Sequence, residues 1–365
     1  MRVGLDYRPA TVAPASGIGR QVRALEQALQ ARADTELVRF SEAPLAHVQR
    51  QSARCPKWAS PLDGLQRPQV RWRFEAKFLP GALREAGIEL YISTANMGLP
   101  LARKHGRRQV LVLHDLFQLT ERNFHRSRLK ALAYRLIDGL SIAWSVLTAD
   151  RVWCPSQFSA DEAARLFPFA RGKLRVLPNL VNGFATVTPE MPSDLPPRYW
   201  LAVGTREPRK NMPLFLQCWQ QARQRSAEVP DLVLVGQADD VAPELRKLAG
   251  LHWRSGLSEA QLCGLYTGAE CLWQPSYAEG FGLPVVEALS VGTPVAAATG
   301  SSLDEVLPPA SPRFAPHDRQ GLIDCLVGVA EQPPARGEEL AAWARRYDFA
   351  AYSRRLDELL GELPR

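Results

Sequence analysis

Short apolar runs alternate with longer amphipathic stretches along the whole 365-residue chain. A run of four or five apolar residues between turn residues is typical of a strand buried on both faces of a parallel sheet, whereas apolar residues spaced three and four apart predict a helix. The predicted strands cover residues 2–6, 110–113, 151–154, 175–179, 199–204, 232–236, 252–257, 271–273 and 294–298. Helical patterns follow Ser16 (Val22, Leu25, Ala28, Leu29) and fill Glu338–Leu360. This alternation indicates an α/β protein with parallel sheets.

Two domains are expected from the length of the chain. The proline-rich stretch Thr188–Pro197 is the best candidate for a linker between them. We therefore place an N-terminal domain at residues 1–188, a C-terminal domain at 189–340 and a C-terminal helical segment at 341–365. In the first domain, Ser159 is expected to cap a helix that runs through Leu166, with Asp161 and Glu162 in its first turn.

The formal net charge of +7 is shared unevenly between the two halves. Residues 1–190 contain 28 Lys and Arg against 16 Asp and Glu, whereas residues 191–365 contain 17 against 22. Such an asymmetry predicts that the first half faces an anionic partner, either nucleic acid or the anionic cytoplasmic leaflet of a membrane. We favour a membrane or a lipid-linked substrate over nucleic acid, and a merely solubilising surface is the plainer alternative.

Basic and aromatic residues interleave between Pro56 and Phe78, as in Lys57-Trp58 and Arg71-Trp72-Arg73-Phe74. This stretch fits a lipid interface, base stacking or ordinary packing of the rings. A second basic region, Leu119–Lys130, is expected to form a loop. No signal peptide or membrane-spanning run is expected, and six scattered cysteines indicate reduced thiols in a cytoplasmic protein.

The most informative stretch is Glu279–Glu287, which reads E-G-F-G-L-P-V-V-E. It predicts a strand, a glycine loop and a helix N-terminus, with Pro284 in the first helical turn, where its missing N–H costs nothing. Free N–H groups of that turn favour an anion such as a phosphate. Because like charges repel, Glu279 and Glu287 suit neutral hydroxyls beside a diphosphate, one on a sugar and one on a ribose. The stretch therefore predicts a nucleotide-sugar site.

A second signal lies in Thr205–Asn211, at the predicted start of a helix. This stretch places three cations, Arg206, Arg209 and Lys210, at the positive end of the helix dipole, which disfavours them. The arrangement predicts that an anion binds there. A polar pair, His114-Asp115, follows the predicted strand 110–113, and polar residues at the carboxyl end of a parallel strand point into a ligand crevice. Asp115 alternatively caps the next helix.

These residues resemble the glutamate–seven-residues–glutamate motif of retaining family 4 glycosyltransferases. Pro275-Ser276, Gly292-Thr293-Pro294-Val295 and Ser301–Val306 stand at that family's usual intervals. The resemblance covers the whole chain and implies the GT-B fold: an α/β architecture of two Rossmann-like, doubly wound domains facing each other across a cleft. It also implies an N-terminal acceptor domain, a C-terminal nucleotide-sugar domain, and a C-terminal helix that crosses back to the first domain.

The resemblance also implies roles for single residues. Glu279, His114 and Lys210 are the expected catalytic residues, with His114 beside the reacting sugar. Arg209 is favoured over Arg206 as the second cation, because Thr205 occupies the family arginine's position. The expected donor contacts are Gly17, Gly19, Thr205, Arg209, Lys210, Gly256, Leu257, Gly280, Phe281, Gly282, Leu283 and Glu287. Gly17 and Gly19 alternatively belong to a helix cap.

The expected function is transfer of a hexose from a nucleoside-diphosphate sugar to a hydroxyl of a saccharide or lipid-linked acceptor, with retention of configuration. No cofactor is expected, and no metal, because the chain has no Asp-x-Asp. GDP-mannose is the favoured donor, from the resemblance of Gly-Ile-Gly-Arg and Glu-Pro-Arg-Lys-Asn to mannosyltransferases of polysaccharide and lipopolysaccharide assembly. The expected partners are donor, acceptor and anionic membrane, with the enzyme in the cytoplasm at the inner face of the plasma membrane.

Three alternatives are weighed against this function. A GT-B epimerase or phosphorylase would share the same motifs and differ only in its products. An NAD-dependent oxidoreductase requires a G-x-G-x-x-G turn with an acid about 20 residues later, and the chain lacks it. A nucleic-acid-binding protein would fit the basic first half but leaves the cation, glycine and glutamate set unexplained.

Overall fold

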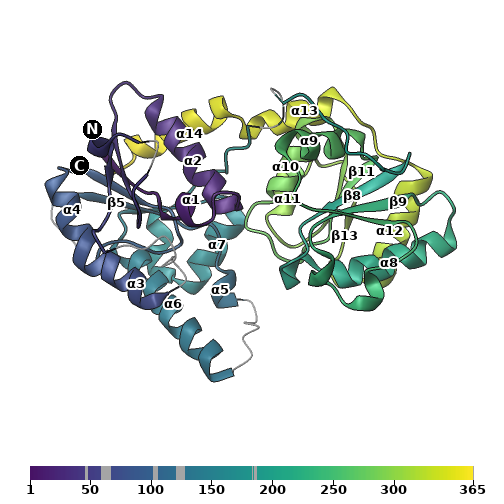
Figure 1. Ribbon diagram of the computed structural model, residues 1–365, viewed down its shortest axis with the longest axis horizontal. Helices are drawn as coiled ribbons and strands as arrows, with labels where there is room; N and C mark the ends of the chain where they lie inside the picture. The colour runs from purple at the N-terminus through teal and green to yellow at the C-terminus, as the bar shows by residue number, and fades with distance from the viewer. Residues whose placement is uncertain are drawn as a thin grey trace. The chain divides into compact units, whose positions relative to one another are not determined.

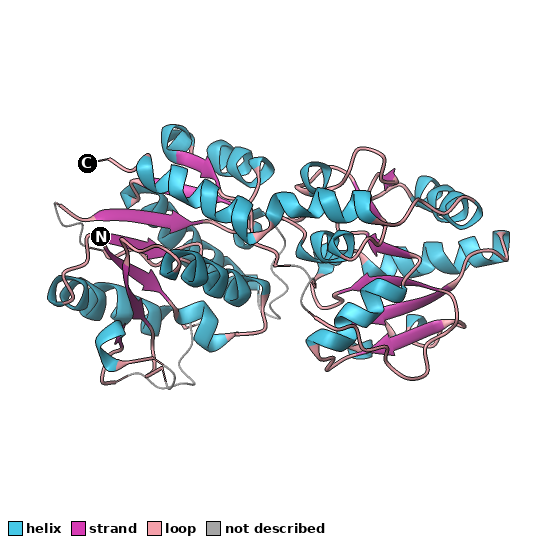
Figure 2. Ribbon diagram, turned by 90° about the horizontal axis from the view of Figure 1, so that it is seen from above, coloured by secondary structure: helices cyan, strands magenta, loops and turns pink. Residues whose placement is uncertain are grey.

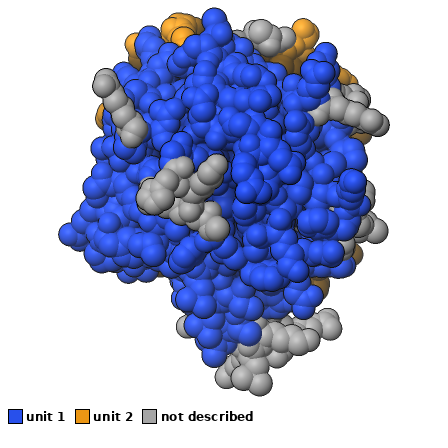
Figure 3. Space-filling model, turned by 90° about the vertical axis from the view of Figure 1, so that its left-hand side faces the viewer, with its two compact units in different colours: residues 1–180, 352–365 blue, residues 181–351 orange. Residues whose placement is uncertain are grey.

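The computed structural model describes residues 1–45, 48–58, 67–101, 106–120, 128–182, 184 and 187–364, with only the backbone given at 50 and 128–131. The chain forms two compact units, which Figure 3 colours separately. Unit 1 comprises Met1–Leu180 and Tyr352–Arg365, and unit 2 comprises Val181–Ala351. The proline-rich stretch near residue 190 belongs to unit 2, where the Glu190 N–H donates to the Ala260 carbonyl (3.0 Å).

Unit 1 contains a seven-stranded sheet in the order β3-β2-β1-β4-β5-β6-β7, and every pair of neighbours is parallel. Its central strands carry buried apolar residues on both faces, as the sequence predicts for a sheet covered by helices. The strands are β1 (Arg2–Asp6), β2 (Glu36–Phe40), β3 (Ala53–Arg54), β4 (Leu90–Ser93), β5 (Arg108–Val112), β6 (Arg151–Cys154) and β7 (Leu174–Val176).

Helices cover both faces of the unit 1 sheet (Figures 1 and 2). They are α1 (Arg8–Val12), α2 (Gly17–Gln30), α3 (Pro68–Arg73), α4 (Leu79–Glu85), α5 (Phe117–Thr120), α6 (Arg128–Thr148) and α7 (Gln157–Leu166), with short helices η1 (Arg50–Ser52), η2 (Phe74–Phe78) and η3 (Pro168–Lys173). The final helix is α14 (Phe349–Gly361), and the chain belongs to unit 1 again from Tyr352 onward. The predicted apolar face of α2 is confirmed, because Val22, Leu25 and Leu29 are buried.

The predicted cap of α7 is wrong by three residues. Ser156, not Ser159, occupies the N-cap, and its hydroxyl accepts a hydrogen bond from the Ser159 N–H (3.0 Å). Asp161 and Glu162 therefore lie beyond the first turn. Both serines satisfy the sequence preference for a cap, and the chain uses the earlier one because the helix begins directly after β6.

Unit 2 contains a six-stranded parallel sheet in the order β10-β9-β8-β11-β12-β13. Trp200 and Trp273 pack against each other in its core at 4.9 Å between ring centroids. The strands are β8 (Tyr199–Val203), β9 (Asp231–Val235), β10 (Leu251–Arg254), β11 (Cys271–Gln274), β12 (Val295–Ala298) and β13 (Arg313–Phe314).

The helices of unit 2 are α8 (Met212–Arg225), α9 (Glu259–Gly268), α10 (Leu283–Ser290), α11 (Leu303–Val306), α12 (Arg319–Glu331) and α13 (Glu338–Ala344), with short helices η4 (Pro208–Lys210), η5 (Ala238–Asp240), η6 (Pro243–Leu245) and η7 (Arg345–Tyr347). The chain leaves β8 for β9 on one side and returns through β11 on the other. In such open parallel sheets ligands bind where the strand order reverses, at the carboxyl ends of the strands. That switch point lies between β8 and β11 in unit 2, and between β1 and β4 in unit 1.

Candidate active site

The predicted strand, glycine loop and helix are confirmed at the switch point of unit 2. β11 ends at Gln274, and α10 begins at Leu283 with Pro284 in its first turn. Gly282 has a φ of 101°, and a Cβ there would lie 2.7 Å from a methyl carbon of Leu303, so only glycine fits. Phe281 is buried edge-to-face against Tyr347. The loop is therefore held rigidly at both ends, with Gly280 buried between Glu279 and Phe281.

Glu279 is the centre of an ion-pair cluster. Its carboxylate oxygens lie 2.6 Å from Lys210 Nζ and 2.6 Å from a terminal nitrogen of Arg209. Burial alone would raise the pKa of Glu279, but Lys210 and Arg209 outweigh it and lower that pKa to about 2. The carboxylate is therefore ionised at neutral pH although only 5% of the residue is exposed.

Loops after three neighbouring strands tie this cluster together. Gln274, at the end of β11, donates from Nε2 to Glu279 (2.8 Å) and to the hydroxyl of Ser276 (2.9 Å). Ser302, after β12, donates its hydroxyl to the Glu279 carbonyl (2.8 Å), and Arg209, after β8, donates to the Ala278 carbonyl (3.0 Å). The sequence reading missed Gln274, whose only signal is a polar side chain that ends an apolar strand.

The ion pairs formed by residues 206–210 correct one prediction made from the sequence. The sequence predicts that these cations need an external anion, but the chain supplies one in Glu279, and Glu207 adds a second ion pair to Arg209 (2.5 Å). Arg206 is exposed, so Arg209 is the arginine that reaches Glu279. The side chains of Arg209 and Lys210 keep 14% and 13% of their surface exposed, so an incoming anion can still reach them.

Thr205 lies buried beside this cluster and braces two loops. Its hydroxyl donates to Asp240 (2.5 Å) and accepts from the Gln237 N–H (3.2 Å). Gly256 has a φ of 65° and is exposed after β10, and Leu257 next to it is half-buried. Both follow a strand whose carboxyl end lies at the same sheet edge, two strands from β8. Their contact with a base stays a prediction.

Glu287 lies on α10, and only 3% of its surface is exposed. The Tyr266 hydroxyl on α9 donates to one of its carboxylate oxygens (2.9 Å). This bond fixes the orientation of the carboxylate on α10. The two glutamates of the motif are therefore both fixed by side-chain partners, Glu279 by cations and Glu287 by a tyrosine.

His114 follows β5 in unit 1 and is buried. The Nε2 of its ring lies 3.0 Å from the Thr94 carbonyl, and the backbone N–H of His114 donates to Asn96 Oδ1 (2.6 Å). Burial lowers the pKa of His114 to about 4, against the hydrogen bond to Thr94, which raises it. The ring is therefore neutral at pH 7, with the hydrogen on Nε2 and an acceptor lone pair on Nδ1. Asp115 accepts from the N–H of Phe117 (3.3 Å), the first residue of α5, but the N-cap position of that helix is Leu116.

Gly17 and Gly19 form the first turn of α2. Ser16 caps this helix, and its hydroxyl accepts from the Gly19 N–H (3.0 Å). A Cβ at Gly19 would lie 2.3 Å from the Ala13 carbonyl oxygen, so close packing after α1 explains this glycine. The amide of Gly19 is already used within the cap, whereas Gly17 is exposed. Their contact with donor phosphates stays a prediction.

Unit 1 fills its own switch point with buried charges that the sequence reading missed. Arg8 is fully buried and forms two hydrogen bonds to Asp6 (2.9 and 2.7 Å) and one to Glu75 (3.2 Å). Beside this network lies a cavity of about 330 Å³, whose lining includes Ser16, Ile18, Arg71, Asn96, Tyr134 and Asp138. The cavity combines apolar walls with a few hydrogen-bonding groups, which is typical of a small-molecule site.

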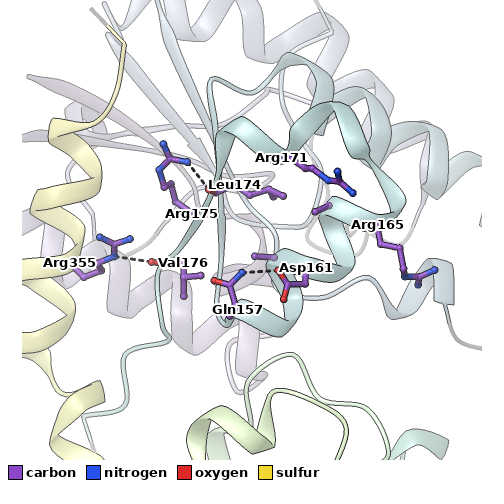
Figure 4. A pocket seen from close by; sticks show the side chains of 10 residues that line it. Gln157, Asp161, Arg165, Arg171, Leu174, Arg175, Val176 and Arg355 are labelled. Carbon is purple, nitrogen blue, oxygen red and sulfur yellow. Dashed lines mark hydrogen bonds between the residues drawn. The ribbon is translucent and has the colours of Figure 1, made fainter.

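A larger cavity of about 750 Å³ lies between α7, β7 and α14, and its lining includes Gln157, Asp161, Arg165, Arg171, Arg175 and Arg355 (Figure 4). The arginines point in different directions in Figure 4. Arg165, Arg175 and Arg355 form ion pairs with Glu162, Glu362 and Glu358 respectively. We assign this cavity no ligand. Across the described ranges, no three His, Cys, Asp or Glu side chains gather as a metal-binding group.

The basic and aromatic stretch before residue 78 is partly structural. Arg71 is buried and donates to Asp138 of α6 (3.0 Å), and Arg73 stacks over Trp58 at 4.7 Å. Ordinary packing therefore accounts for part of the pattern. The predicted basic loop falls largely outside the described residues, because 121–127 are not described.

Comparison with known proteins identifies both halves of the chain. The family model for glycosyltransferase family 4 matches residues 15–182, and the model for glycosyl transferases group 1 matches residues 188–320. The O-antigen chain mannosyltransferase B of Escherichia coli is 30% identical over 218 residues, 55% of each chain. The O-antigen chain mannosyltransferase RfbU of Salmonella typhimurium is 25% identical over 78% of this chain and 76% of its own.

Among solved structures, the sucrose-phosphate synthase of Thermosynechococcus elongatus superposes with a TM-score of 0.75. The match covers 100% of this chain and 99% of that one at 19% identity, so it establishes the fold alone. The two parallel-sheet units thus form the GT-B fold that the sequence predicts. The two family models together span most of the chain, and the protein belongs to the family 4, group 1 glycosyltransferases.

Proposed function

We propose that this protein is a retaining, metal-independent mannosyltransferase. It moves mannose from GDP-mannose to a hydroxyl of a saccharide or lipid-linked acceptor, in the assembly of a cell-surface polysaccharide or lipopolysaccharide. The observation that carries the proposal is the Glu279–Lys210–Arg209 cluster beside the glycine loop at the switch point of unit 2. The choice of mannose rests on the relatives that are named O-antigen mannosyltransferases.

The donor diphosphate would take over the cations that Glu279 now holds. Lys210 and Arg209 are reachable, and the amides around Gly280–Leu283 begin a helix, where anions are favoured. A diphosphate carries more charge than one carboxylate, so it competes well for both cations. Glu279, released from one or both ion pairs, would then accept hydrogen bonds from hydroxyls of the sugar. The same cluster would thereby bind the diphosphate through its two cations and the sugar through Glu279.

The nucleoside end would lie along the same edge of the sheet. Glu287, oriented by Tyr266, would accept a hydrogen bond from a ribose hydroxyl. The loop at Gly256 and Leu257 would hold the base through main-chain groups, since Gly256 is exposed and left-handed. The glycine loop follows β11 and the Gly256 loop follows β10, so both lie at the carboxyl edge of the same parallel sheet.

The proposed chemistry is a front-face substitution at the anomeric carbon. The bond from that carbon to the diphosphate oxygen breaks, the bond to the acceptor oxygen forms on the same face, and the departing diphosphate takes the acceptor proton. Negative charge grows on the diphosphate, where Lys210 and Arg209 stabilise it more strongly than in the ground state. Neutral His114 would accept a hydrogen bond at Nδ1 from a hydroxyl of the transferred sugar. It would not act as an acid, because its pKa is about 4.

The acceptor would bind in the cavity of about 330 Å³ in unit 1. Its lining includes Asn96, which also holds the backbone of His114. Tyr134, Asp138 and Arg71 offer both donors and acceptors there, as a saccharide requires.

A donor panel tests the proposal directly. The protein is incubated with GDP-mannose, UDP-glucose, UDP-galactose and dTDP-glucose, with and without EDTA, and release of nucleoside diphosphate is measured. Release from GDP-mannose that exceeds the other donors and survives EDTA supports the proposal, and NMR of the product should show the α-anomeric configuration of the donor. Preferred turnover of another donor, loss of activity with EDTA, or an inverted product would overturn the corresponding part.

Lys210→Ala should lower kcat/KM by about 10²–10³, because one preorganised donor to the developing charge is lost. Arg206→Ala is the matched control: this neighbouring cation is exposed and should change kcat/KM by less than about threefold. Steady-state kinetics with the preferred donor compares them. Equal losses in the two variants would show that general positive charge, and not the cluster, matters.

Substitution of Glu279 should mainly lower turnover, whereas substitution of Glu287 should mainly weaken nucleotide binding. Glu279→Gln should lower kcat by about a hundredfold while nucleoside diphosphate binds as well or more tightly, because the cations lose a competitor. Glu287→Gln should raise the Kd for nucleoside diphosphates about tenfold or more, because a hydrogen bond to a charged group is lost. Calorimetric titration with GDP and kinetics measure the two effects. Parallel losses of affinity and turnover in Glu279→Gln would contradict the assignment.

His114 should make stability depend on pH. Its folded pKa of about 4 lies below its ordinary 6.5, so the unfolded chain binds more protons between these values and stability falls as pH drops through them. Between about pH 7 and about pH 4.5 this group should cost about 2 kcal/mol of unfolding free energy. His114→Gln should lack that loss in urea unfolding, whereas a control at exposed His317, His317→Gln, should retain it. Identical pH slopes for His114→Gln and the native protein would refute this.

A further inference from the structure

The loop after β4 carries a side-chain amide of which only one end is used within the protein. Asn96 is 2% exposed, and its Oδ1 accepts the hydrogen bond from the backbone N–H of His114 (2.6 Å). Because an N–H can only donate, the oxygen of the amide must face His114, and this fixes Nδ2 on the other side. Nδ2 donates to none of the residues that the structure describes. A buried donor without a partner is costly, so this nitrogen indicates a place for a ligand.

The unused nitrogen opens on the cavity of about 330 Å³ in unit 1. Asn96 lines this cavity. Among the described side chains, its Nδ2 is not one of the polar atoms that are both sealed from solvent and without a partner. A molecule in the cavity can therefore reach Nδ2, and an oxygen of that molecule would accept its hydrogen bond.

The backbone around Asn96 holds this donor in place. The Asn96 N–H donates to the Val112 carbonyl (3.3 Å), and the Ser93 hydroxyl donates to the Met97 carbonyl (2.7 Å). Asn96 has a φ of 58°, a left-handed conformation that asparagine adopts more readily than most residues other than glycine. The amide is thus preorganised, which lowers the entropy lost when it binds a ligand.

The same loop also fixes the ring of His114. Thr94, two residues before Asn96, has its carbonyl 3.0 Å from His114 Nε2, and its hydroxyl donates to the Asp6 carbonyl at the end of β1 (2.7 Å). One loop therefore bonds to both the backbone and the ring of His114. A ligand that accepts from Asn96 Nδ2 would be placed at a fixed position relative to that ring.

The rest of the cavity wall suits a neutral saccharide. Arg71 and Asp138 neutralise each other across 3.0 Å, so neither favours a charged ligand. Asp138 lies on α6, and none of the described helices, α6 included, is long and apolar enough to span a membrane. Val12, Ile18 and Met97 add apolar surface to the wall. A pyranose ring presents C–H groups on its faces and hydroxyls at its rim, which matches apolar walls with a few fixed polar groups.

We infer that Asn96 binds the saccharide acceptor, donating from Nδ2 to a hydroxyl oxygen of the acceptor while Oδ1 holds His114. This inference rests on the proposed function and names a residue that positions the second substrate. An amide NH₂ group donates and does not take a proton. The proton of the bound hydroxyl therefore stays available to the departing diphosphate.

The test is an NMR titration of the full chain, without donor. The chain is labelled with ¹⁵N at its five asparagines, and the side-chain amide of Asn96 is assigned from its absence in Asn96→Asp. The methyl α-pyranosides of mannose, glucose, galactose and N-acetylglucosamine are added in turn. At least one should shift the Asn96 side-chain resonances. Asn96→Asp should bind that glycoside at least about tenfold more weakly, because an acceptor replaces the donor while the bond from His114 is kept.

Asn179→Asp is the matched control, since Asn179 is half-buried in unit 1 and does not line the cavity. This variant should bind the glycoside like the native protein. No shift of the Asn96 amide by any of the four glycosides, or equal affinities of the native protein and Asn96→Asp, would overturn the inference. The shift in the native protein needs no variant, so the test holds even if Asn96→Asp folds poorly.

Calorimetric titration with GDP separates this inference from the proposed function. GDP should bind equally to the native protein, Asn96→Asp and Asn179→Asp, because the proposed donor site lies in unit 2. Absence of GDP binding in the native protein would count against the proposed function, whereas the glycoside titration reports on Asn96 alone.

Discussion

The ion pairs from Lys210 and Arg209 to Glu279 are the interaction on which the structure of the site depends. They join the loops after β8 and β11 on the two sides of the switch point, and they fix a carboxylate that burial would otherwise neutralise. A buried charge left without its partner would be costly, so the three side chains stay together until another anion arrives. In our proposal, this internal anion holds the two cations in place for the diphosphate.

The charged side chains at the switch points of the two units differ in their exposure to solvent. In unit 1, Arg8 and Asp6 are sealed completely, and Glu75 completes the network. In unit 2, the cations keep about a seventh of their side-chain surface in contact with water. Sealed charges can only hold the fold, whereas reachable ones can exchange partners. This difference in exposure, more than the sheet topology that both units share, supports our proposal that unit 2 binds the donor.

Local patterns in the sequence predicted β1, β5 and most strands of unit 2, the glycine loop and the start of α10, because each depends on residues next to one another in the chain. The strands β2 and β4 were missed, although β4 is the middle strand of the unit 1 sheet. Short strands such as β3 and β13, with two residues each, leave too little pattern to see. The partner of Lys210 lies 69 residues away, and only the fold brings it within reach. The same holds for Arg8 with Glu75. The apolar residues of α6 were visible, but which of them face water depends on packing.

The central claim is that a diphosphate replaces Glu279 as the partner of the two cations. A crystal structure of the protein with bound GDP measures this most directly. The account predicts phosphate oxygens within hydrogen-bonding distance of Lys210 Nζ and Arg209, with at least one of the present contacts to Glu279 broken. Phosphates bound elsewhere, with both ion pairs to Glu279 intact, would contradict it.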